Sequence, residues 1–136
     1  MPAPTPEAPV SARETTAAVL VVDDDSATRV LYEIYLRSFG YVVLLARDGD
    51  EALRVAAGRS DIRIMIMDVV MPGLSGQRLV DAAKIALPGV RILFCSGHPA
   101  KVLTGYGIDP AVEHFLQKPC RPADFKRKMD ELSASS

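Results

Sequence analysis

The central segment of the chain reads Ile62-Arg63-Ile64-Met65-Ile66-Met67-Asp68. An apolar run of this length predicts a strand that is buried on both faces of a sheet. The run ends at a carboxylate, and the next residues, 69–73, contain a Pro-Gly pair that cannot continue a strand smoothly. Asp68 is therefore predicted to stand at the carboxyl end of a buried strand.

Three other apolar runs end in polar groups in the same way. Residues 18–22 lead into Asp23-Asp24-Asp25, residues 90–95 into Ser96-Gly97, and residues 112–117 into Lys118-Pro119. Carboxylates, a hydroxyl and an ammonium at successive strand ends are the groups that bind a divalent cation together with a phosphoryl group. Taken one at a time, each has a simpler explanation as a helix cap, a turn or a solvated loop. Their joint occurrence at four strand ends favours a site.

Predicted strands and helices alternate along the chain. Strands are predicted over 18–22, 41–46, 62–67, 90–95 and 112–117, and helices over 26–39, 48–58, 75–87 and from Pro122 onward. Asp48, with Glu51 three residues later, is predicted to cap the second of these helices. Strands that are apolar on both faces indicate a doubly wound parallel sheet with helices on each side, a three-layer α/β sandwich. Ligands bind such sheets outside the carboxyl ends of the strands, where the strand order reverses.

The helix periodicity also predicts which faces are buried. The first helix is expected to turn Ala27, Leu31, Ile34 and Tyr35 inward, and the last helix Phe125, Met129 and Leu132. Residues 99–104 are expected to form a short or mobile helix, because two glycines and a proline come between residues 105 and 110.

Composition limits the class of protein. A chain of 136 residues with a net charge of −1 is large enough for one domain and gives no general attraction to nucleic acid or membranes. Residues 1–16 are rich in Pro and Ala and are expected to be a disordered leader or linker remnant, so the domain is assigned to 17–136. Cys95 is expected to be a core thiol and Cys120 to be partly exposed. Without a secretory signal the expected location is the cytoplasm.

The acidic cluster carries most of the predicted chemistry. Asp23, Asp24 and Asp68 would repel one another if they were brought together, and a hard cation with a preference for oxygen ligands, Mg²⁺ or Mn²⁺, would relieve that repulsion. Asp68 could then attack phosphorus, since carboxylates form covalent aspartyl phosphates. Lys118 and Ser96 would supply positive charge and a hydrogen bond to the phosphoryl oxygens.

Together these segments resemble the receiver domain of response regulators in two-component and phosphorelay signalling. The resemblance covers about residues 17–134, and residues 94–99 together with 115–119 look most like receivers of hybrid histidine kinases. It implies a flavodoxin-like (βα)5 fold with five parallel strands in the order 2-1-3-4-5.

The resemblance also implies roles for individual residues. Asp68 would accept a phosphoryl group from a phosphohistidine, Asp23 and Asp24 would hold Mg²⁺ together with the backbone carbonyl of Val70, and Ser96 and Lys118 would bind the phosphoryl oxygens. Ser96 and Phe115 would form the conformational switch. Val70 and His98 would flank the site, and an apolar Val70 predicts slow to moderate autodephosphorylation.

The implied partners are a histidine kinase or histidine phosphotransfer protein and a downstream protein target, with a possible phosphorylation-dependent homodimer. No direct contact with nucleic acid or membrane is expected, and the domain would catalyse only its own phosphorylation and dephosphorylation. Both a stand-alone regulator and a receiver excised from a hybrid kinase fit the sequence.

Three alternative functions are open to a chain with these residues. A haloacid-dehalogenase-like phosphatase would place the phosphoryl adduct on Asp23 and leave Asp68 unexplained. A flavodoxin-like electron carrier would need a phosphate-binding loop where this chain has three carboxylates. A receiver-like binding module that works without phosphorylation usually lacks one of the acidic residues or the lysine, and all of these are present here.

Overall fold

The computed structural model describes residues 17–74, 76–97, 99, 104–105, 107–108 and 114–134. The elements, in chain order, are β1 (Ala18–Val22), α2 (Ser26–Ser38), β2 (Val42–Ala46), α3 (Gly49–Ala57), β3 (Ile62–Met67), α4 (Gly76–Ala86), β4 (Arg91–Ser96), β5 (His114–Gln117) and α5 (Pro122–Ala134). The predictions for β1 and β3 are confirmed residue for residue, and most other boundaries agree within one residue. Residues 112–113 of the predicted fifth strand and most of the predicted helix at 99–104 lie outside the described residues.

The five strands form one parallel sheet in the order β2-β1-β3-β4-β5. This arrangement confirms the predicted doubly wound fold. From β1 the chain moves outward to β2, then crosses back over β1 to build β3, β4 and β5 on the other side. The strand order therefore reverses between β1 and β3, and the carboxyl ends of these two strands flank the reversal point.

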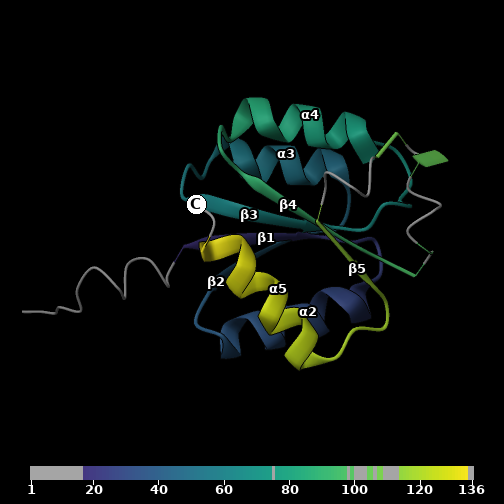
Figure 1. Cartoon of the computed structure of the whole chain (residues 1–136). Coiled ribbons are helices and arrows are strands. Elements are labelled where there is room, and N and C mark those ends of the chain that lie inside the picture. The colour runs from purple at the N-terminus through teal and green to yellow at the C-terminus, as the bar shows by residue number, and fades with distance from the viewer. Residues whose placement is uncertain are drawn as a thin grey trace, which may run out of the picture.

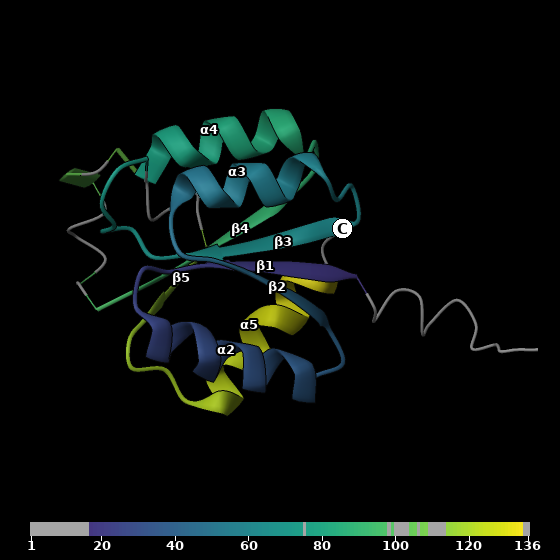
Figure 2. The ribbon, with the colours of Figure 1, turned by 180° about the vertical axis from the view of Figure 1, so that it is seen from behind.

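Two layers of helices cover the sheet. Helices α3 and α4 lie on one face and α2 and α5 on the other, as the opposite views of Figures 1 and 2 show. Side chains along each strand alternate between the two faces. In β1, for example, Leu20 joins the core beneath α3 and α4, whereas Val19 and Val21 join the core beneath α2 and α5.

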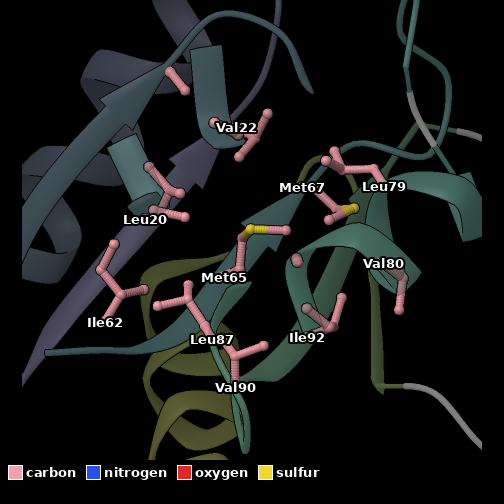
Figure 3. Close-up of a cluster of buried hydrophobic side chains, with 14 of the residues drawn as sticks. Leu20, Val22, Ile62, Met65, Met67, Leu79, Val80, Leu87, Val90 and Ile92 are labelled. Atoms are coloured by element: carbon pink, nitrogen blue, oxygen red, sulfur yellow. The ribbon is translucent and has the colours of Figure 1, made fainter. Parts of the chain in front are cut away.

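The core beneath α3 and α4, the α3/α4 layer, is built mainly from small and aliphatic side chains, with Phe94 as its one fully buried ring among the described residues. Figure 3 shows Leu20, Met65 and Met67 of the sheet in one buried cluster with Leu79 and Val80 of α4. On the helices themselves, Ala52 and Ala56 of α3 and Ala83 of α4 are buried. Small residues allow these helices to approach the sheet closely.

The core beneath α2 and α5, the α2/α5 layer, is aromatic. The Phe125 ring meets three other rings edge-on, with centroid distances of 4.9 Å to Tyr32, 5.9 Å to Tyr35 and 6.3 Å to Phe39. Such contacts each contribute about 0.5–1.5 kcal/mol beyond simple burial. The predicted inner face of α5 is confirmed, since Phe125, Met129 and Leu132 are all buried.

The predicted inner face of α2 is wrong in part. Tyr35 is half-buried as expected, but Ala27 is exposed, and Leu31 and Ile34 are 42% and 60% exposed, while Tyr32 and Leu36 are the buried residues. Apolar residues cover more of this helix than one buried face needs, and only the side of Arg29, Glu33 and Arg37 is charged, so periodicity alone does not select the buried residues. The edge-on packing of Tyr32 against Phe125 of α5 makes the selection, and it depends on a residue 93 positions away in the chain.

Carboxylates cap the first two helices. Asp25 accepts a hydrogen bond from the backbone N–H of Thr28 at the start of α2. Asp48 accepts one from the N–H of Glu51 at the start of α3, at 2.8 Å, and the Glu51 carboxylate accepts from the N–H of Arg47. The predicted cap at Asp48 is confirmed.

Among the described residues, no helix combines the length and apolar character needed to span a membrane.

The start of α3 also supports the segment that comes after β3. A Cβ atom added to Gly49 would lie 2.2 Å from the carbonyl oxygen of Leu74, far closer than any real contact. Only glycine allows the backbone of 71–74 to come this close to α3. Glycine at this position therefore helps to fix the path of the chain just after Asp68.

Candidate functional site

Four chain segments converge at the carboxyl edge of the sheet. Asp23 follows β1, Asp68 follows β3, Ser96 ends β4 and Lys118 follows β5. Backbone hydrogen bonds hold these ends in register: the N–H of Asp68 donates to Val22 at 3.2 Å, and the N–H of Lys118 donates to Ser96 at 2.7 Å. The strand register therefore brings together the residues that the sequence placed at separate strand ends.

Three carboxylates form the acidic part of the site. One carboxylate oxygen from each of Asp23, Asp24 and Asp68 lies within 4.8 Å of the other two. Asp23 is buried at 2% exposure, Asp68 is half-buried and Asp24 is exposed. An all-oxygen donor set that is open to solvent on one side fits a hard divalent cation such as Mg²⁺, which keeps part of its water shell.

Lys118 connects the two inner carboxylates. Its Nζ atom lies 2.8 Å from Oδ2 of Asp23 and 3.0 Å from Oδ2 of Asp68. Each carboxylate uses its other oxygen to accept from the backbone: Asp23 Oδ1 from the N–H of Asp25 at 2.9 Å, and Asp68 Oδ1 from the N–H of Val70 at 3.1 Å. Both side chains are thus held at two points before any ligand arrives.

The charges in this cluster influence one another. Burial raises the pKa of Asp23, although the hydrogen bond from Lys118 opposes that rise. Burial would lower the pKa of Lys118, but the hydrogen bonds to Asp23 and Asp68 outweigh it and raise the pKa above its usual value. The outcomes differ because Lys118 faces two carboxylates, whereas Asp23 faces one ammonium and the like charge of Asp68. Lys118 therefore stays protonated at neutral pH.

The remaining predicted residues lie around this centre. Ser96 is fully buried at the end of β4, and Val70 is half-buried just after Asp68. Phe115 is half-buried on β5, paired in register with Phe94, and packs against the core of the α3/α4 layer. His98 lies outside the described residues.

One contributor was not anticipated from the sequence. The Arg29 side chain, from the first turns of α2, donates a hydrogen bond to the backbone carbonyl of Asp23. It ties the helix to the segment that carries two of the three carboxylates. Its position six residues after Asp23, in the first turns of the helix that comes after the acidic run, is the only sequence signal, and it is weak.

Fold and site together define a doubly wound α/β domain with an acidic, lysine-bridged pocket at its switch point. The comparison with protein families gives the class a name. The model of the response regulator receiver domain matches residues 19–130, and the chain belongs to this family.

Similar proteins carry the same domain in different settings. The chain is 28% identical over 116 residues to the response regulator SaeR of Staphylococcus epidermidis, which covers 85% of this chain and 50% of SaeR. It is 32% identical over 124 residues to the sensor kinase CckA of Brucella abortus, covering 83% of this chain and 13% of CckA. The chain thus spans half or less of these two relatives.

Solved structures of receiver domains have the same fold as this chain. A crystal structure of the receiver domain of the hybrid histidine kinase CckA is similar with a TM-score of 0.72 and 31% identity, over 85% of this chain and 98% of that one. The chemotaxis protein CheY4 of Vibrio cholerae gives a TM-score of 0.76 and 28% identity, over 86% and 98%. The predicted receiver family and fold are confirmed.

Proposed function

We propose that this domain is a phosphoacceptor, in which Asp68 receives a phosphoryl group from a phosphohistidine on a histidine kinase or histidine phosphotransfer protein. The observation that carries the proposal is the Lys118 ammonium, held between the carboxylates of Asp23 and Asp68 with Asp24 beside them. A nucleophile, a permanent positive charge and a set of cation ligands then occupy one pocket. This combination is what phosphoryl transfer to a carboxylate requires.

The transfer itself is a displacement at phosphorus. A carboxylate oxygen of Asp68 attacks the phosphorus atom and forms a P–O bond while the P–N bond of the phosphohistidine breaks, and the electron pair returns to the imidazole nitrogen. Lys118 already hydrogen-bonds Asp68 at 3.0 Å, so it is placed to donate to a phosphoryl oxygen on that residue. The Ser96 hydroxyl would provide a further hydrogen bond.

Asp23, Asp24, Asp68 and the backbone carbonyl of Val70 are proposed to hold Mg²⁺ or Mn²⁺. The oxygen-only donor set suits a hard cation, and the close approach of the three carboxylates gives it a reason to bind. When bound, the ion offsets negative charge on the carboxylates and on the phosphoryl oxygens.

Two pairs of residues are proposed to act once Asp68 carries the phosphoryl group. Ser96 moving toward that group and Phe115 turning inward would form the switch; Phe115 is half-buried on an edge strand, so its ring can turn without emptying the core.

Val70 and His98 would set the phosphoryl lifetime. An apolar Val70 cannot orient an attacking water, which gives slow to moderate autodephosphorylation. An unchanged hydrolysis rate in His98→Ala would remove His98 from this role.

The surroundings of the domain are also proposals. The matched regions of a response regulator and a sensor kinase are compatible with a separate regulator and with one module of a hybrid histidine kinase. We propose a cytoplasmic domain that acts through a downstream protein partner, with a phosphorylation-dependent homodimer as one form of output and no direct contact with nucleic acid or membrane. The predicted leader or linker, residues 1–16, lies outside the described residues.

Intact-mass analysis after incubation with acetyl phosphate and Mg²⁺ tests the proposal. One phosphoryl adduct is expected, absent in Asp68→Asn and absent when a chelator is present. Mapping the adduct to Asp23 instead would indicate phosphatase-like chemistry. A folded protein that binds Mg²⁺ but takes no phosphoryl group from acetyl phosphate or from phosphorylated histidine kinases would contradict the proposal and favour a phosphorylation-independent binding module.

A further inference from the structure

A second chemical cluster lies behind the phosphoacceptor site, in the α2/α5 layer. It consists of Tyr32 of α2, Cys95 of β4 and Cys120, which comes after Lys118 and Pro119 in the connection to α5. The Tyr32 hydroxyl lies 3.8 Å from the Cys120 Sγ atom. Cys95 and Tyr32 belong to the buried core of this layer, and Cys120 packs against that core. Three segments distant in sequence therefore place two thiols and a hydroxyl in one cluster.

The two thiols differ in access to solvent. Cys95 is 1% exposed and Tyr32 is 3% exposed, whereas Cys120 is only partly buried. A reagent dissolved in water can therefore reach Cys120, and Cys95 lies directly behind it. This arrangement places a reachable sulfur in front of a buried one.

The electrostatics favour a thiolate on the reachable sulfur. The hydrogen bond from Cys95 lowers the pKa of Cys120 to about 6, against the effect of its own burial, and the Tyr32 hydroxyl and the Lys118 charge act in the same direction. The hydrogen bond to Cys120 and burial raise the pKa of Cys95, and burial raises that of Tyr32. The shifts run in opposite directions, so Cys120 is the group of this cluster that loses its proton most readily.

We propose that Cys120 is an oxidation site for hydroperoxides and that Cys95 resolves it to an intrachain disulfide. In the first step the Cys120 thiolate attacks one oxygen of hydrogen peroxide, the O–O bond breaks, and sulfenic acid and hydroxide form. In the second step the sulfur of Cys95 attacks the Cys120 sulfur, the S–O bond breaks, and the hydroxyl leaves as water with the Cys95 proton. Sulfur is oxidised and the peroxide oxygen is reduced.

The simpler explanation, two thiols that merely fill the core, accounts for Cys95 but not for Cys120. A packing residue does not need both partial exposure and a hydroxyl aimed at its sulfur. Cys95 lies in the core cluster against which Cys120 packs, so an S–S bond of about 2 Å would join side chains of the same layer.

The location gives the disulfide a consequence that rests on the proposed function. Cys95 directly precedes Ser96, and Cys120 lies two residues after Lys118. A bond between the two sulfurs would tie together the backbone segments that carry both groups proposed to bind the phosphoryl oxygens. We infer that oxidation slows phosphorylation of Asp68 by on the order of ten-fold or more, since small misplacements of catalytic groups are costly.

The full-length chain is treated with hydrogen peroxide, unfolded, alkylated with N-ethylmaleimide and weighed intact. The expected product has lost two hydrogen atoms, carries no maleimide, and accepts two maleimides after reduction. Cys95→Ala should stop at a sulfenic acid that dimedone traps, and Cys120→Ala should leave Cys95 reduced. Recovery of two free thiols in the peroxide-treated parent would overturn the proposal. Oxidation of Cys95 to the same extent in Cys120→Ala as in the parent would overturn it as well, because Cys95 would then not need Cys120.

Tyr32→Phe provides a variant that keeps the ring packing on Phe125 and removes only the hydroxyl. It should lower the rate of Cys120 alkylation at pH 6, where the parent thiol is expected to react about ten-fold faster than free cysteine. A parent rate no faster than that of free cysteine would overturn the assignment of the thiolate. Labelling with acetyl phosphate is measured on the oxidised and on the reduced chain in a separate experiment. The disulfide itself is detected by mass, so that test does not depend on whether Asp68 takes a phosphoryl group. Equal labelling of an active domain in both forms would overturn the coupling.

Discussion

The two helical layers solve the same packing problem in different ways. The α3/α4 layer uses alanines, aliphatic side chains and the close approach of Gly49 to Leu74, whereas the α2/α5 layer uses four aromatic rings centred on Phe125. Close backbone contact fixes position by steric exclusion and leaves no polar atom behind. Large rings fix position by interlocking, and the tyrosines among them bring hydroxyl groups into this layer, as Tyr32 does beside Cys120. The α2/α5 layer therefore combines packing with polar groups that can take part in chemistry.

Phe125→Ala should have the largest effect on stability. Removing the ring empties the centre of the aromatic cluster, and we expect a loss of about 3–5 kcal/mol in the free energy of unfolding. Leu79→Ala, at an equally buried position of the α3/α4 layer, should cost less, because no edge-on ring contacts are lost there. Urea denaturation of both variants measures the difference. An equal or greater loss at Leu79 would show that the layers do not differ in this way.

Lys118→Ala tests whether the chemistry depends on the segment that leads into the α2/α5 layer. With the ammonium gone, Asp68 loses its charged partner, and the rate of phosphorylation by acetyl phosphate should fall on the order of 10²-fold, or about 3 kcal/mol. Lys126→Ala, on the exposed side of α5, is the matched control and should leave the rate unchanged. A rate within about two-fold of the parent in Lys118→Ala would contradict the role of Lys118.

Gly49→Ala tests the close approach in the α3/α4 layer. The added methyl group would overlap the Leu74 carbonyl oxygen, so the segment after Asp68 must shift, at a cost of about 1–3 kcal/mol. Thermal unfolding measures the cost, and acetyl phosphate labelling reports whether the shift reaches Asp68. Gly58→Ala at the end of the same helix, where a Cβ would lie 3.8 Å from its nearest neighbour, is the control and should change neither quantity by much.

A smaller effect on stability is expected from the protonation of the Cys120 thiol as the pH falls. Its folded-state pKa lies below the usual thiol value, so the associated stabilisation is fully present above the unfolded pKa of about 8.5 and is lost as the pH falls through about 6. Parent and Cys120→Ala should therefore differ more in urea midpoint at pH 9 than at pH 5. A difference that does not change with pH would mean that Cys120 is not a thiolate in the folded domain.

The smallest effects should come from the outer surfaces, where the two layers are equivalent. Ile34 on α2 and Ile85 on α4 are 60% and 82% exposed. Replacing either with Lys should change the free energy of unfolding by less than about 0.5 kcal/mol. A loss above about 1 kcal/mol at one position but not the other would reveal a packing role that the exposed fraction does not show.

The sequence predicted the sheet better than it predicted the helix surfaces. β1 and β3 were located residue for residue because they are short runs, apolar except for Arg63, that end in charged residues, and a central parallel strand has few other ways to fold. The predicted buried face of α2 was wrong in part because apolar residues cover more than one face of that helix, and its orientation is set by Phe125, a residue of the last helix.

The residues of the site divide in the same way, into those that strand order predicts and those that side-chain packing determines. Asp23, Asp68 and Lys118 could be placed together from strand order alone, since parallel strands bring their carboxyl ends to one edge. The support from Arg29 and the contact between Tyr32 and Cys120 depend on side-chain packing between separate elements, which no local pattern encodes.

The burial of the strands has a consequence for the rates at which backbone amides exchange hydrogen with solvent. β1 is buried along its whole length and β3 at every residue except Arg63, so their amides should exchange only when the whole domain opens. β5 is a short, half-buried edge strand and should exchange through local opening. Asp23 and Asp68 follow slowly exchanging strands, whereas Phe115 lies on the rapidly exchanging strand and Lys118 directly follows it. The carboxylate half of the site is therefore expected to open less often than the lysine half.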